Sequence, residues 1–72
     1  MNKIEAQSVY TKIWEIMKKY GFDSLNEDEI IALLQECEIE EQKYQGHQLR
    51  LWINLATALN KYYGEISHGN DT

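Results

Sequence analysis

Glycine divides this proline-free chain into three stretches, each long enough for one helix of a small domain. The four glycines stand at positions 21, 46, 64 and 69, and a tyrosine precedes each of the first three by one or two residues. Glycine often follows the last residue of a helix because it adopts the left-handed conformation without strain. We therefore predict helices near residues 3–20, 27–44 and 48–63, in a single domain over 1–64 that is followed by a frayed polar tail at 65–72.

The size and composition of the chain limit the class of protein. Seventy-two residues make one small domain near the lower size limit for independent folding, so self-association is an option. The content of 43% hydrophobic residues is too high for a disordered protein. The chain has no run of about 18 apolar residues, no apolar signal-peptide core, and one cysteine, Cys37, which excludes an internal disulfide. We expect a cytoplasmic all-α protein with no membrane association, a small three-helix bundle that is either monomeric or homodimeric.

The first stretch has the apolar periodicity of an amphipathic helix. Asn2 and Glu5 have the spacing of a capping box at its start. The face predicted to pack on a core comprises Ala6, Val9, Tyr10, Ile13, Trp14, Ile16, Met17 and Tyr20. Trp14 and Trp52 are expected to be among the largest side chains of this core.

The second stretch starts with the strongest helix signal in the chain and then becomes irregular. Asn26 can cap the amide of Glu29, between the two apolar residues of a hydrophobic staple. Farther along, Glu41 projects from the middle of the apolar face, and Ile39 points to the opposite side. Two outcomes are open: the core ends near Cys37, or the helix bends or stops around residues 38–40. If the helix continues, Ile39 is exposed among acids.

Acidic side chains are concentrated in residues 22–45. This segment carries eight acidic residues and one lysine, whereas the other 48 residues have a net charge of +2. Such a surface repels nucleic acid and attracts basic protein surfaces. The first hypothesis is therefore a small non-enzymatic regulatory or inhibitory protein, of the kind that phages and mobile elements encode, which binds a partner protein with a basic surface. The residues predicted to bind the partner are Glu36, Glu38, Ile39, Glu40 and Glu41.

Two alternatives to this hypothesis concern the same acids. They can act as a nucleic-acid mimic, in which carboxylates replace phosphates and occupy a DNA- or RNA-binding groove. They can also do no more than keep a helix face in water, as most charge runs do.

The third stretch is apolar over most of its circumference. Such a helix either touches both of its neighbours or buries a second stripe against another chain. The sequence therefore also allows a self-assembling structural subunit, with an oligomer interface formed by Leu51, Leu55, Ala58 and Tyr62.

A narrow polar strip on the third stretch supports a further alternative. In a helix-turn-helix protein such a strip of donors would read the major groove of DNA. The net charge of −5 disfavours nucleic-acid binding, so this remains the weaker alternative. The strip consists of Arg50, Asn54, Thr57 and Lys61.

No motif in the chain predicts catalysis, a metal or a cofactor. Cys37 lies on an apolar face, where cysteine usually behaves as a small hydrophobic residue. His47 and His68 belong to no ligand pair, and residues 23–30 lack the key ligands and the glycine of a calcium loop. We therefore expect that the protein is not an enzyme.

Overall fold

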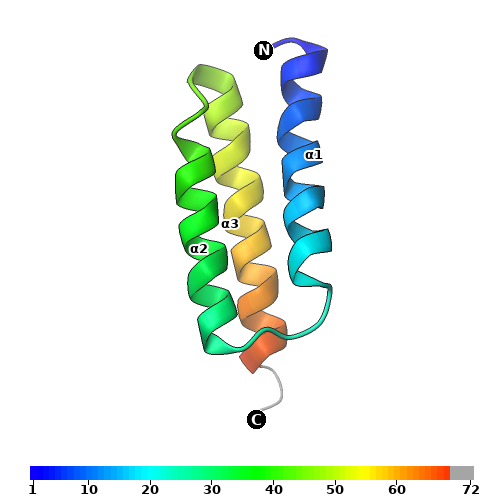
Figure 1. Ribbon diagram of the computed structural model, residues 1–72. Coiled ribbons are helices and arrows are strands. Elements are labelled where there is room, and N and C mark those ends of the chain that lie inside the picture. The colour runs from blue at the N-terminus through cyan, green and yellow to red at the C-terminus, as the bar shows by residue number, and fades with distance from the viewer. Residues whose placement is uncertain (69–72) are drawn as a thin grey trace.

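Three antiparallel helices make up the fold in the computed structural model, which describes residues 1–68 (Figure 1). Helix α1 covers Lys3–Tyr20, α2 covers Glu27–Glu41 and α3 covers Gly46–His68. Successive helices run in opposite directions, and α3 packs against both of the others (Figure 1). The contact between α1 and α2 is smaller than the contact of either helix with α3. The predicted all-α three-helix bundle is confirmed.

Two capping boxes determine where α1 and α2 begin. The side-chain oxygen of Asn2 accepts a hydrogen bond from the Glu5 amide at 2.8 Å, and the Glu5 carboxylate accepts one from the Asn2 amide at 2.9 Å. Asn26 and Glu29 repeat this reciprocal pair at 2.8 and 3.0 Å. Each box satisfies amides that have no partner within the helix. Both predicted starts are confirmed.

The helix ends differ from the prediction at two places. Helix α2 ends at Glu41, three residues before the predicted end, and a short turn leads to Gly46 at the start of α3. Helix α3 continues through Gly64 to His68, so the prediction of a frayed tail is wrong for residues 65–68. Residues 69–72 of that predicted tail lie outside the described residues.

Contacts of the last turn explain why α3 continues. Ile66 packs against the core, and the Ser67 hydroxyl accepts a hydrogen bond from the Leu25 amide at 2.9 Å. Tertiary contacts of this kind outweigh the low helix propensity of a single glycine. The extension holds the start of α2 against the end of α3.

Two glycines provide a matched test of these backbone assignments. Gly64 lies inside α3 with open space where an added methyl group would point, whereas Gly46 has a φ of +59°. We expect Gly64→Ala to raise the free energy of unfolding by about 0.4–1 kcal/mol, because alanine loses less entropy on entering a helix. Gly46→Ala should lower it by about 1–2 kcal/mol, because left-handed backbone strains an L-residue. Urea unfolding of both variants measures the two effects, and changes of the same sign would contradict the assignment.

The core runs along the inner faces of the three helices. Its fully buried side chains are Val9, Ile16, Leu33, Trp52 and Tyr63. The prediction for Trp52 is confirmed, but the prediction for Trp14 is wrong because 52% of its surface is exposed. Trp14 lies at the edge of the apolar face of α1 and stacks on Phe22, with 5.6 Å between ring centroids.

Candidate protein-binding surfaces

The five residues predicted to bind a partner do not share one surface. Glu36, Ile39 and Glu40 line a groove between α1 and α2, whereas Glu38 and Glu41 line a second groove between α2 and α3. Ile39 is the most open of them, with 63% of its surface exposed. Helix α2 continues through residues 38–40 and leaves Ile39 exposed, and the core extends past Cys37 to Tyr44. The acids therefore have two different environments.

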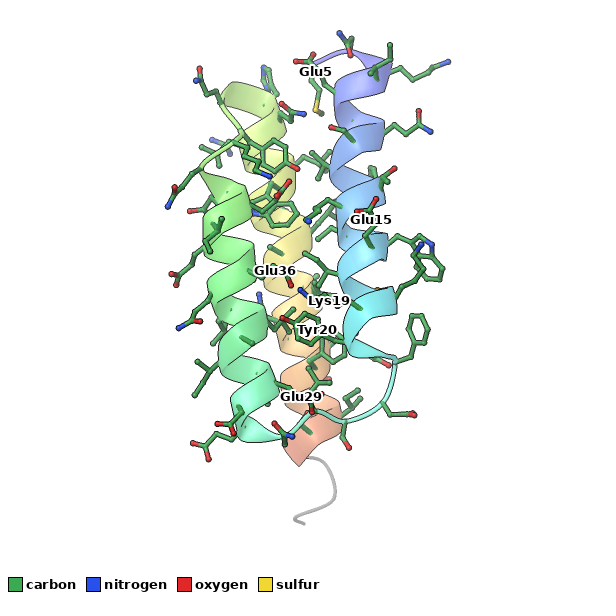
Figure 2. All side chains as sticks on the ribbon, viewed as in Figure 1. Glu5, Glu15, Lys19, Tyr20, Glu29 and Glu36 are labelled. Carbon is green, nitrogen blue, oxygen red and sulfur yellow. The ribbon has the colours of Figure 1, made fainter. Side chains whose placement is uncertain are left out.

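Glu36 is occupied within the molecule. Its carboxylate accepts a hydrogen bond from the Lys19 ammonium at 2.9 Å, and Figure 2 shows Lys19 and Tyr20 on the side of α1 that faces Glu36. Burial acts to raise the pKa of Glu36, but the hydrogen bond and charge of Lys19 outweigh it, so that the pKa is lowered. Burial and the adjacent carboxylate raise the pKa of the Tyr20 phenol. Glu36 thus serves to join α1 to α2.

Glu40 is the buried acid of α2, with 7% of its surface exposed. The Tyr44 hydroxyl donates a hydrogen bond to it at 2.7 Å, and the ammonium groups of Lys43 and Lys12 lie at 3.0 and 4.0 Å. Burial acts to raise the pKa of Glu40, but the bonds from Tyr44 and Lys43 prevail and lower it. Burial and the charge of Glu40 raise the pKa of Tyr44. The periodicity pointed to Glu41 as the acid on the apolar face, and Glu41 is instead exposed.

The groove between α2 and α3, here called the acidic groove, combines apolar walls with acids. Leu34 and Ile53 form the walls and are 44% and 42% exposed. The buried Cys37 and Trp52 lie beneath them, and the exposed Glu38 and Glu41 stand on the α2 side. Among the described side chains, those of residues 1–67, neither of these two acids forms an ion pair. The acidic groove thus presents apolar surface beside uncompensated negative charge.

Polar contacts stabilise the floor of the acidic groove. The Asn60 amide donates to the Ala56 carbonyl at 2.8 Å and lies 3.8 Å from the Cys37 sulfur. Burial raises the pKa of the Cys37 thiol, while Asn60 acts in the opposite direction. Cys37 is a buried core thiol, as predicted.

A second exposed surface, here called the aromatic face, lies along α1 and α3. The Tyr62 hydroxyl donates to the backbone carbonyl of Phe22 at 2.8 Å, and the Phe22 ring stacks on Trp14, so these contacts link the three residues. The Lys18 ammonium lies over the Trp14 ring, 5.9 Å from its centroid. We define the aromatic face as Trp14, Phe22 and Tyr62, the α3 residues Leu51, Leu55 and Ala58 that share a helix side with Tyr62, and the exposed Tyr10 one turn before Trp14 on α1.

The aromatic face contains the stripe predicted as an oligomer interface. Leu51 and Leu55 are half-buried against the core, whereas Ala58 and Tyr62 are exposed. The periodicity of α3 located this stripe, but it did not reveal the aromatic residues that extend it. Phe22 was overlooked because it lies in the turn between α1 and α2, where no helical period applies.

The polar strip proposed for DNA recognition is exposed along its whole length, at Arg50, Asn54, Thr57 and Lys61. However, α2 and α3 lie side by side in opposite directions (Figure 1). A helix-turn-helix unit needs its two helices to cross at about 90–120°. The antiparallel pair differs from that arrangement, and DNA recognition by the strip stays a prediction.

Comparisons with known proteins return no match: no family model fits the chain, and the searches of curated proteins and of solved structures find no relative. Within the described part of the chain, no helix is long and apolar enough to cross a membrane. Among the same residues, no group of three or more His, Cys, Asp or Glu side chains is placed to hold a metal ion.

Proposed function

We propose that this protein is a small non-enzymatic regulator that binds a basic amphipathic helix of a partner protein in the acidic groove. The observation that carries the proposal is the exposure of Leu34 and Ile53 beside Glu38 and Glu41. Apolar side chains at the centre of an interface supply most of the binding energy, and surrounding charges select the partner and speed encounter. A partner with the opposite arrangement, apolar in the middle and basic at its edge, complements this surface.

The spacing of exposed residues on α2 favours a helix as the bound element. Five exposed positions follow one another at intervals of four, three, four and three residues, which is the seam spacing of packed helices. They are Glu27, Ile31, Leu34, Glu38 and Glu41. Ile53 and Thr57 continue the same surface on α3. A helix laid over both would complete a four-helix arrangement.

The internal ion pairs leave two of the four predicted acids, Glu38 and Glu41, in the proposed binding set. Glu36 and Glu40 already bind lysines of the molecule itself, so a partner would have to break those bonds to use them. Glu38 and Glu41 can bind a partner without breaking an ion pair of this kind. The proposed binding set is therefore Leu34, Glu38, Glu41 and Ile53, with Ile31 at its edge.

A charge reversal tests the proposal. We expect Glu38→Lys with Glu41→Lys to weaken binding of a fluorescent helical peptide of leucine and lysine by about tenfold or more, because attraction becomes repulsion. Fluorescence anisotropy at low and high salt measures the affinity, and the wild-type protein should bind more weakly at high salt.

The matched control changes net charge by the same amount away from the groove. Glu15→Lys with Asp23→Lys replaces two exposed acids on α1 and on the turn after it. This variant should bind the peptide nearly as well as the wild-type protein. Equal weakening by both double variants would show that net charge alone attracts the peptide, and the acidic groove would lose its role.

A further inference from the structure

We infer that the aromatic face is the interface of a homodimer, in which α3 packs antiparallel against α3 of a second copy. This interface uses a different surface from the acidic groove, so the two proposals stand or fall separately. Exposed rings are costly to leave in water, and Tyr10, Trp14 and Phe22 are each about half exposed. The ring stack of Trp14 on Phe22 and the hydrogen bond from Tyr62 to the Phe22 backbone link these exposed residues of α1, α3 and the turn.

Helix α3 has the spacing that antiparallel pairing needs. Leu51, Leu55, Ala58, Tyr62 and Glu65 follow at intervals of four, three, four and three residues. In an antiparallel pair about a two-fold axis, Leu51 faces Tyr62 of the second copy, and Leu55 faces Ala58. The small side chain of Ala58 near the axis allows the two helices to approach closely.

The charges at the ends of the stripe fit this pairing. Glu65 lies at one end, and the exposed Arg50 and His47 lie near the other. Antiparallel pairing brings Glu65 of one copy toward Arg50 of the second, and the two-fold axis creates this contact twice. The middle of the stripe carries no acid, so nothing opposes the contact there.

Charge also favours the aromatic face over the acidic groove as the surface that binds a second copy. Packing the acidic groove on itself would place Glu38 and Glu41 against the same acids of the second copy, which is unfavourable. The aromatic face has no such conflict at its centre. A standard interface buries about 800 Å² on each partner, which is roughly 15% of the 5221 Å² surface of this chain. The stripe spans residues 51–62 of α3, and the exposed rings of Tyr10, Trp14 and Phe22 add to its area.

Sedimentation equilibrium of the full chain over a wide concentration range tests the inference. We expect a reversible dimer that does not grow further. Ala58→Glu should weaken dimerisation by about tenfold or more, because it buries a charge near the two-fold axis. Ala58 is exposed in the monomer, so this variant keeps its helical circular dichroism. Gln35→Glu, at an exposed position of α2 outside the aromatic face, is the control and should dimerise normally.

A charge exchange gives an independent test of the antiparallel pairing. Arg50→Glu and Glu65→Arg should each weaken the dimer, and the double variant should recover it. A chain that stays monomeric at every concentration overturns the inference. So do an Ala58→Glu variant that dimerises like the wild type, and growth into larger oligomers, which would show that the aromatic face binds a different face of the next copy.

Discussion

Replacing Trp52 by alanine should remove most of the stability of this protein. Trp52 is fully buried, and its ring lies 5.4 Å from that of Tyr44, measured between centroids. Truncation of a buried tryptophan typically costs about 3–5 kcal/mol. A domain has only about 0.05–0.15 kcal/mol of stability per residue, so a loss of this size leaves a chain of 72 residues little reserve. Thermal unfolding followed by circular dichroism should show a broad transition or none.

The second tryptophan supplies the control for this prediction. Trp14 is half exposed, and its ring stacks on Phe22 at the surface. Trp14→Ala should therefore lower the free energy of unfolding by about 1 kcal/mol or less. The comparison is best made in the Ala58→Glu background, where the inferred dimer does not add to stability. Equal losses for the two tryptophans would refute the assignment of Trp52 to the core and Trp14 to the surface.

The next largest loss in the free energy of unfolding is expected when Glu40 is replaced. Glu40→Ala leaves the Tyr44 hydroxyl and the Lys43 ammonium without their acceptor. Hydrogen bonds to a charged group contribute about 1.5–3 kcal/mol, so urea unfolding at neutral pH should show a loss of this order. Glu41→Ala removes the adjacent, exposed carboxylate and should change stability by no more than about 0.5 kcal/mol.

The effect of Glu40 should depend on pH in a defined direction. Its pKa in the folded protein lies below the ordinary value of 4.5. The stabilisation from its ionised form is therefore fully present above pH 4.5 and is lost as the pH falls through the folded pKa. The difference in stability between the wild type and Glu40→Ala should shrink in this acid range. A constant difference down to strong acid would show that the carboxylate charge is not what stabilises the bundle.

Local signals made the helices predictable. The capping residues Asn2 and Asn26 act within four residues of their own positions, so the sequence alone indicates where α1 and α2 begin. The end of α3 depends on Ile66 and Ser67, which contact residues far away in the chain. A glycine that stops an isolated helix does not stop one that is held by such contacts, and Gly64 illustrates this.

The candidate sites were harder to predict because they depend on which sides of α2 its neighbours occupy. Glu40 and Glu41 are adjacent in sequence but lie about 100° apart around the helix axis. The periodicity of the sequence predicts that Glu41 lies on the buried side of α2. In the structure Glu40 is the buried acid, because it contacts Lys12 of α1 and the Tyr44 hydroxyl. A signal for the ion pairs existed in the seven-residue spacing of Lys12 and Lys19, which puts both beside the apolar face of α1.

The burial of Cys37 has a consequence for the chemical behaviour of the whole molecule. Its sulfur is the only thiol of the chain, and it lies beneath the acidic groove with little access to solvent. A bulky alkylating reagent reaches it only when α2 moves away from α3, and air oxidation cannot link two folded copies through it. The rate at which Cys37 is alkylated therefore measures how often α2 separates from α3, and the measurement needs no added label.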